Sequence, residues 1–136
     1  MTDPDAWLRE VALTELDAKM GLEVLAISRD EVVGRVPVAG NTQPFGLLNG
    51  GVSAYLAETL ASLAAMAEVG PDGIAAGVDL NATHHTSARS GWATGVARPL
   101  RVGRSLASYE VVVSDDAGER LCTARLTVFL RRPRGA

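Results

Sequence analysis

Residues 43–67 read QPFGLLNGGVSAYLAETLASLAAMA, and this stretch decides the fold. After the turn-forming PFG, the pattern from Asn49 onward is apolar on nearly every side, and Glu58 is its single charged residue. A helix of this kind is normally buried inside a protein rather than laid on its surface. Ser, Thr and Glu interrupt it too often for a membrane span. The stretch therefore predicts a buried central helix over residues 49–69 with a lone carboxylate near its middle.

Strand patterns flank this helix, two before it and four after it. The strands are predicted at residues 22–27, 31–38, 74–87, 91–102, 105–114 and 120–130, where Val, Ile and Leu are enriched between turn signals. A short helix is predicted within residues 1–20, capped by Asp3 and ended by Gly21. Short turns such as DDAG at 115–118 favour antiparallel pairing. We therefore expect an α+β fold, an antiparallel sheet wrapped around one long helix, in a single domain over residues 1–136.

Composition limits the classes of protein and of partner. Apolar residues make up 47% of the 136 residues and charged residues 21%, which is typical of a globular domain. The net charge of −3 gives no indication of nucleic-acid binding, although an anionic ligand needs only a local basic patch. Cys122 is the only cysteine, and the acidic N-terminus has no apolar run behind it. These features exclude an internal disulfide, give no sign of a signal peptide and favour the cytoplasm.

Glu58 is the first candidate for a functional residue. A carboxylate in a buried helix is costly unless it has partners or a task. The ordinary interpretation is a glutamate that faces solvent or pairs with an arginine. Its neighbours at three and four residues on the same helix face are Ala54, Tyr55, Ala61 and Ser62. Three of these four are small, which leaves space beside the carboxylate and favours a functional acid.

Asn49-Gly50-Gly51 opens the central helix. Asparagine is a good N-cap and glycine tolerates a tight turn, so the motif alone has low specificity. The first N–H groups of a helix are also free donors at the positive end of its dipole. Two glycines let a ligand approach those donors closely, and such an arrangement can hold a developing oxyanion.

Other side chains are less informative by themselves. His84 and His85 are neighbours on one predicted strand, so at most one of them faces the helix, and a metal pair is disfavoured. Ser53 and Ser62 have no G-x-S-x-G setting, and no phosphate-binding glycine loop is present. Arginines gather at two places, around the Val102-Gly103 turn and at the C-terminus: Arg98, Arg101, Arg104, Arg131, Arg132 and Arg134. They are ordinary solvated strand ends unless the ligand carries phosphates.

Taken together, these motifs resemble the hotdog-fold acyl-CoA thioesterases, and among them the aryl-CoA thioesterases of the 4-hydroxybenzoyl-CoA and 1,4-dihydroxy-2-naphthoyl-CoA type. The resemblance runs from residue 42 to residue 130, through QPFGLLNGGVSAYLAETLAS, LNATHH at 80–85 and the PL and GR pairs at 99–100 and 103–104. Its most specific part is the spacing of Gln43, Gly50, Glu58 and Ser62. LNATHH resembles the dihydroxynaphthoyl-CoA branch most closely.

The resemblance implies hydrolysis of an aromatic acyl-CoA to a free acid and CoA, without a metal or redox cofactor. It implies that Glu58 attacks the thioester carbonyl or activates a water that does so. The Gly50 N–H would polarise the thioester oxygen, Gln43 would position the carbonyl, and Ser62 would orient the carboxylate or the water. His84 or His85 would line the acyl pocket and contact a ring hydroxyl. The CoA phosphates would lie on Arg104, Ser105, Arg131 and Arg132.

Asn49 departs from the family pattern, which usually has His-Gly-Gly at this point. Asparagine can cap the helix and donate a hydrogen bond, but it cannot carry a proton charge, so we expect slower turnover. The departure leaves a non-catalytic acyl-CoA-binding protein as an alternative, beside a thioesterase for other acyl chains. A hydratase on the same fold is disfavoured because no Asp/His pair is placed for it.

The spacing of Gly50 and Glu58 predicts a site shared by two subunits. The two residues are eight apart, which is roughly 12 Å along a helix, and they differ by about 80° in direction. Both groups have to reach one carbonyl within about 3 Å. Two such helices packed antiparallel about a two-fold axis would bring Gly50 of one to Glu58 of the other. The resemblance implies the same homodimer, often paired again into a homotetramer, with neither nucleic acid nor membrane as partner.

Overall fold

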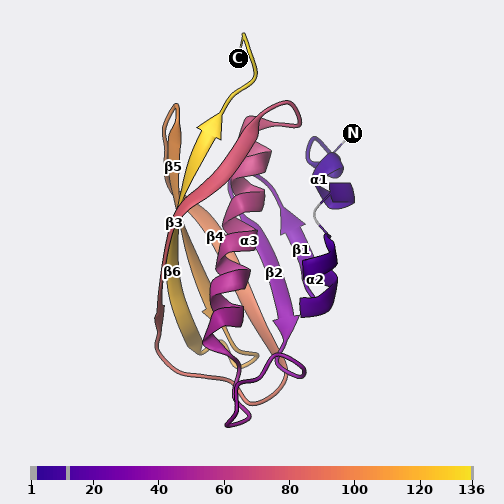
Figure 1. The fold of residues 1–136 in the computed structure, drawn as a ribbon, viewed down its shortest axis with the longest axis vertical. Coiled ribbons are helices and arrows are strands. Elements are labelled where there is room, and N and C mark those ends of the chain that lie inside the picture. Colours follow the sequence, from indigo (N-terminus) through magenta and orange to yellow (C-terminus); the bar gives the residue numbers. More distant parts are fainter. Residues whose placement is uncertain (1–2, 12, 136) are drawn as a thin grey trace.

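The elements of the computed structural model follow the predicted order (Figure 1). They are α1 (Ala6–Val11), α2 (Glu15–Met20), β1 (Glu23–Ile27), β2 (Val32–Pro37), α3 (Gly50–Val69), β3 (Ile74–His84), β4 (Trp92–Val102), β5 (Leu106–Ser114) and β6 (Arg120–Arg131). The six strands form an antiparallel sheet in the order β1-β2-β4-β5-β6-β3. The sheet curves around α3, which confirms the predicted α+β architecture with one long central helix.

The N-terminal segment differs from the prediction, because two short helices replace the single helix expected in residues 1–20. The structure describes residues 3–11 and 13–135, so positions 1, 2 and 12 of the predicted helix lie outside the described residues. The break has a local cause at Thr14, which is extended (φ −85°, ψ 176°) and caps α2. The Thr14 N–H donates to the Asp17 carboxylate at 3.0 Å, and the Asp17 N–H donates to the Thr14 hydroxyl. This capping box starts a new helix where one continuous helix was expected.

Asp17 also fastens α2 to the central helix. Its carboxylate is buried and accepts a hydrogen bond from the hydroxyl of Tyr55 on α3. Burial, together with this hydrogen bond and the nearby negative charge of Asp17, raises the pKa of Tyr55 well above its ordinary value.

The central helix contacts all six strands. Its buried positions are spread around its circumference: Val52, Ser53, Leu56, Ala57, Leu60, Ala61, Leu63, Ala64, Ala65 and Val69. By length and composition alone α3 could cross a membrane, but more than half of that segment is buried against the sheet. A helix in the core of a protein is apolar on all sides because all of its sides are buried.

Two glycines on neighbouring strands receive the side chain of Leu60. Gly34 of β2 and Gly95 of β4 are paired directly across the sheet. A Cβ atom on Gly34 would lie 2.6 Å from Leu60 Cδ2, and a Cβ on Gly95 would lie 2.7 Å from Leu60 Cδ1. Both distances are far inside van der Waals contact, so the fully buried Leu60 occupies the space that two missing side chains leave. This contact brings α3 close to the middle of the sheet.

Strand β3 lies at one border of the sheet, and within the described residues it pairs with β6 alone. Its register shifts between Gly77 and Asp79, which leaves Val78 without a partner on β6, a β-bulge. Ala75 and Gly77 face the helix before the bulge, and Leu80, Ala82 and His84 face it after the bulge. Ile74 and Val78 are 50% and 60% exposed at this border.

Replacing Gly95 by Ala should destabilise the fold by about 1–3 kcal/mol, because the added methyl overpacks the site of Leu60. The effect should be measured as a fall in the free energy of unfolding in urea. Thr94→Ala, the outward-facing neighbour on the same strand, serves as the control and should change stability by less than about 1 kcal/mol. Unchanged stability of Gly95→Ala would mean that Leu60 can move aside freely, against the packing described above.

Candidate active site

A cavity of about 210 Å³ lies at the first turn of α3. Its lining comes from the loop before α3, from α3 itself, from the end of β3 and the loop after it, and from β6: Gln43, Leu48, Gly50, Ser53, His84, Thr86, Ser87 and Leu121. The sequence analysis predicted Gln43, Gly50 and His84 as site residues in three separate segments. In the structure they line one cavity.

The helix start is built as the sequence predicted. Asn49 is the N-cap of α3, and its side-chain oxygen accepts a hydrogen bond from the Gly51 N–H at 2.8 Å. The backbone N–H of Asn49 donates to the Asn41 carbonyl at 2.9 Å, which fixes the cap to the preceding loop. Gly50, as the first helical residue, has no acceptor within the helix for its own N–H. That donor points out of the helix end, beside the cavity that Gly50 lines.

His84 lies directly against Gly50. A Cβ atom on Gly50 would be 3.0 Å from His84 Nε2 and 3.1 Å from Cε1, so only glycine lets the imidazole approach this close. His85 is on the opposite side of the strand, where its Nε2 is 2.9 Å from the Thr123 hydroxyl. Strand alternation predicted that one histidine at most would face the helix, and the structure shows that it is His84.

Gln43 is oriented by its own loop. Its side-chain carbonyl accepts hydrogen bonds from the Phe45 N–H at 2.5 Å and from the Leu47 N–H at 3.4 Å. The carbonyl end is therefore occupied, and the NH₂ end is the group available to a ligand in the cavity. Phe45, at the tip of this loop, is 82% exposed.

Glu58 does not line this cavity. Its carboxylate lies over Gly77 of β3, where an added Cβ would be 2.9 Å from Oε2 and 3.2 Å from Oε1. Oε2 is buried and has no hydrogen-bond partner among the described residues. Ser62, one turn further along α3, is half-buried, and no hydrogen bond joins it to Glu58 within the described part of the chain.

The two halves of the predicted site are far apart within one chain. Gly50 lies at His84 and Glu58 lies at Gly77, and these two strand residues are seven positions apart on β3. Seven residues of strand span roughly 20 Å. The corresponding eight residues of α3 span roughly 12 Å. Both spans exceed the reach of about 3 Å that each group needs toward one carbonyl.

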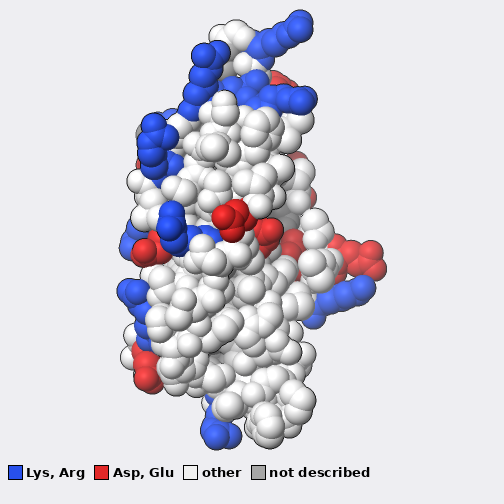
Figure 2. Space-filling view, turned by 60° about the vertical axis from the view of Figure 1, so that its left-hand side comes forward, with Lys and Arg blue, Asp and Glu red and all other residues white. Residues whose placement is uncertain are grey.

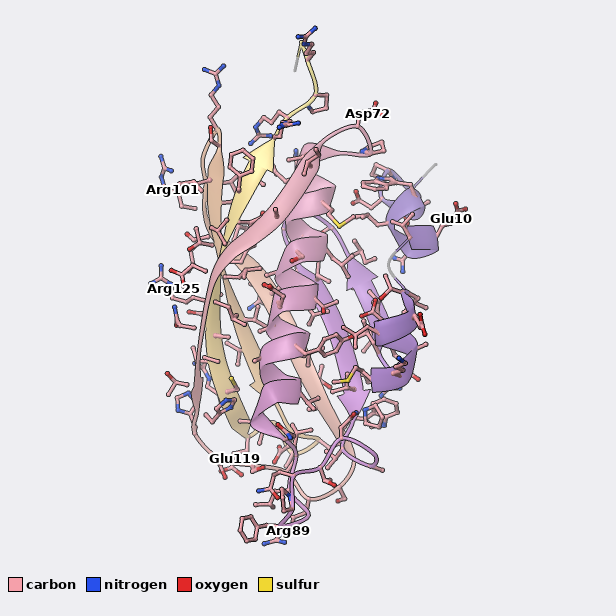
Figure 3. All side chains as sticks on the ribbon, in the orientation of Figure 1. Glu10, Asp72, Arg89, Arg101, Glu119 and Arg125 are labelled. Carbon is pink, nitrogen blue, oxygen red and sulfur yellow. The ribbon has the colours of Figure 1, made fainter. Side chains whose placement is uncertain are left out.

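A second cavity, of about 400 Å³, lies at the far end of the molecule, where β6 ends. Its lining is strongly basic and includes all four residues predicted to bind the CoA phosphates: Arg104, Ser105, Phe129, Leu130, Arg131, Arg132, Pro133, Arg134 and Gly135. Figure 2 shows Lys and Arg side chains gathered at this end of the surface. Arg101 lies elsewhere: Figure 3 shows it projecting with Arg125 from the outer side of the sheet, away from α3. Arg98 is paired with Glu31 at 2.7 Å.

Arg132 links this basic cavity to the end of α3. It forms an ion pair with Glu68 at 3.4 Å and donates to the Gly103 carbonyl at 3.1 Å. The fully buried Tyr109 lies close by, and its hydroxyl has no partner among the described residues. Burial, and then the negative charge of Glu68, raise the pKa of Tyr109 to about 12, although Arg132 opposes the shift.

Several site residues were missed in the sequence. Thr86 and Ser87 follow the end of β3 and carry no motif, so only the fold brings them to the cavity. Ser53 was considered only as a nucleophile, although a small polar residue one turn into α3 is a natural cavity wall. Gly77 was not predicted as a site residue, because nothing in the neighbouring sequence indicates that Glu58 lies over it. Among the described residues, no group of three or more His, Cys, Asp or Glu side chains is placed to hold a metal ion.

Comparison with known proteins agrees with this architecture. Residues 45–122 match the thioesterase superfamily. Over 130 residues the chain is 42% identical to the proofreading thioesterase EntH of Klebsiella pneumoniae, covering 89% of this chain and 95% of that protein.

Solved structures show the same relationship in three dimensions. The crystal structure of a thioesterase from Haemophilus influenzae superposes with a TM-score of 0.88 at 29% identity, over 100% of this chain and 97% of that one. A mutant thioesterase from Pseudomonas aeruginosa superposes with a TM-score of 0.87 at 32% identity, over 96% of both chains. The chain therefore belongs to the thioesterase superfamily: it has the hotdog fold and is a thioester hydrolase.

Proposed function

We propose that this thioesterase hydrolyses an aromatic acyl-CoA, such as 1,4-dihydroxy-2-naphthoyl-CoA or a hydroxybenzoyl-CoA, to the free acid and CoA. The observation that carries the proposal is the cavity at the start of α3, where Gln43, Gly50 and His84 converge. Leu48 and Leu121 provide apolar wall for a ring. The imidazole of His84 and the nearby hydroxyl groups supply polar partners for ring hydroxyls, as in most small-molecule sites.

In the proposed reaction, the thioester carbonyl lies at the helix start. The NH₂ group of Gln43 and the N–H of Gly50 donate hydrogen bonds to its oxygen. Negative charge grows on that oxygen as the carbonyl carbon becomes tetrahedral, so donors at the positive end of α3 stabilise the transition state more than the ground state.

Glu58 supplies the attacking electron pair in either of two ways. As a nucleophile its carboxylate adds to the carbonyl carbon, expels the CoA thiolate and leaves an anhydride that water cleaves. As a general base it takes a proton from a water that adds to the same carbon, and the thiolate again departs. A buried carboxylate oxygen without a hydrogen-bond partner supports either role, because no protein donor ties up its lone pairs.

The proposed site is shared between two copies of the chain. The separation of Glu58 and Gly50 within one chain, at Gly77 and at His84 of β3, supports this proposal. Strand β3 has one edge without a strand partner in the described chain and two exposed apolar side chains, Ile74 and Val78. Pairing β3 with β3 of a second copy about a two-fold axis would cover that edge. The two α3 helices would then lie antiparallel, with Gly50 of one near Glu58 of the other, and two such dimers would form the tetramer.

The basic cavity at the end of β6 is the proposed site for the CoA phosphates. Glu68, the partner of Arg132, follows Glu58 by ten residues, which is roughly 15 Å along α3. In CoA an extended pantetheine arm separates the thioester from the phosphates, and it can bridge such a distance. Arg104, Arg131 and Arg132 offer the charged donors that phosphate groups prefer. We expect no cofactor besides the CoA of the substrate, and activity in the cytoplasm.

A panel of acyl-CoA thioesters, assayed by release of free thiol, tests the substrate. Aromatic acyl groups should give a higher kcat/KM than straight chains of similar size, since the cavity combines ring-sized walls with polar groups. Glu58→Ala should lower turnover on the order of 10³-fold or more. Glu119→Ala, an exposed carboxylate in the β5–β6 turn, is the control and should leave turnover unchanged. A clear preference for long alkyl chains would contradict the aromatic assignment, and full activity of Glu58→Ala would contradict the role of Glu58.

Asn49→His tests the departure from the family pattern. If asparagine at this position lacks an assisting role that the histidine of the family pattern has, Asn49→His should raise kcat roughly tenfold. This factor is equivalent to about 1.4 kcal/mol of transition-state stabilisation. The same change removes the cap on Gly51, so the free energy of unfolding should fall by about 1 kcal/mol. Asn49→Ala is the matched control, because it loses the cap without adding an imidazole. A gain in kcat for Asn49→Ala, or none for Asn49→His, would mean that the site has readjusted around asparagine.

Co-refolding of two inactive variants tests the shared site. Gln43→Ala and Glu58→Ala are mixed in equal amounts, unfolded, refolded together and assayed. Random pairing makes about half of the dimers mixed, and each mixed dimer has one intact site, so about a quarter of wild-type activity should return. Each variant refolded alone is the control. Mixed dimers that form without regaining activity would place the whole site within one chain.

A further inference from the structure

The Glu58 carboxylate lies over the backbone of a neighbouring strand. The backbone beneath it is that of Gly77 on β3, and both carboxylate oxygens are closer to the Cβ position of Gly77 than an ordinary contact allows. We propose that Gly77 is a positioning residue for Glu58: the side chain it lacks leaves the space in which the carboxylate is held. The inference rests on the proposed catalytic role of Glu58.

The backbone of Gly77 does not itself demand glycine. Its φ is not positive, unlike that of Gly21 or Gly70, so an L-amino acid would fit the conformation without strain. Glycine inside a strand weakens it, because the chain loses more entropy on folding and has no side chain to pack. The need for space is therefore the reason that the structure gives for glycine at this position.

The bulge after Gly77 lets the same strand serve both halves of the site. Residues seven apart face opposite sides of an uninterrupted strand. The extra residue, Val78, restores the alternation, so that Gly77 and His84 both face α3. One strand thus holds the Glu58 carboxylate at one point and the imidazole over Gly50 at another.

Adding a methyl group at Gly77 would displace the carboxylate. The new Cβ would be 2.9 Å from Oε2 and 3.2 Å from Oε1, so the carboxylate must move by several tenths of an ångström. Misplacing a reacting group by about 1 Å can cost 10²-fold in rate. The cost should appear in kcat, because the displaced carboxylate acts in the chemical step and none of the residues that line the cavity at the start of α3 is altered.

The test is a double-mutant cycle between Gly77→Ala and Glu58→Asp. Gly77→Ala alone should lower kcat by roughly ten- to a hundredfold and change KM by less than about twofold. Aspartate is one methylene shorter and retreats from the added methyl. In the Glu58→Asp background, Gly77→Ala should therefore change kcat by less than about threefold. Gly95→Ala is the matched control, since it crowds Leu60 instead, and its effect should be the same factor in both backgrounds. An unchanged kcat for Gly77→Ala, or an equal loss in both backgrounds, would overturn the proposal.

A second double-mutant cycle, between Gly77→Ala and Glu58→Ala, measures Tm instead of kcat. If the methyl group clashes with the carboxylate, Gly77→Ala should lower Tm in the wild-type background and not in Glu58→Ala, where the carboxylate is absent. This also decides the case in which Gly77→Ala does not fold: folding restored by Glu58→Ala supports the proposal, and failure in both backgrounds overturns it. If Glu58→Ala instead keeps wild-type turnover, the catalytic proposal fails, while the Tm cycle still measures the contact.

Discussion

The close approach of α3 to the middle of the sheet is the constraint on which the rest of the structure depends. It is set where Leu60 enters the space above Gly34 and Gly95, which are paired on neighbouring strands. Alanines fill much of the remaining interface, so helix and sheet backbones stay near each other over the whole length of α3. Packed interiors transmit displacements because they contain few voids. The positions of both ends of the helix, and of Glu58 between them, therefore follow from this central contact.

This geometry separates the chemical groups instead of gathering them. The helix start offers its free N–H groups to the small cavity, while Glu58 faces β3 further along and the arginines lie beyond the helix end. A buried carboxylate oxygen without a donor costs free energy, which the packing of α3 has to offset. A buried polar atom without a partner calls for an explanation, and a catalytic role is one such explanation. If two copies share the site as proposed, association brings the separated groups together.

The features that depend on local sequence patterns could be predicted. The apolar run of α3, its Asn49 cap, the six strands and the single inward histidine all follow from local pattern and alternation. The split of the N-terminal segment was missed although its cause is local, since Thr14 and Asp17 are spaced as a capping box. The bulge at Val78 could not be predicted, because it exists only relative to the register of β6. For the same reason the partners of Gly77 and Gly95 were unknown before the helix was placed on the sheet.

The bulge in β3 also bears on how the protein avoids aggregation. A long strand with a free edge is a template on which other strands can add without limit. Both border strands of this sheet are irregular: β3 is interrupted at Val78, and β1 has a register shift between Val24 and Ala26. An irregular edge presents its N–H and C=O groups at broken intervals, so a regular foreign strand can match only a short part of it. Irregular borders of this kind therefore protect a newly made chain from the addition of foreign strands along much of both edges.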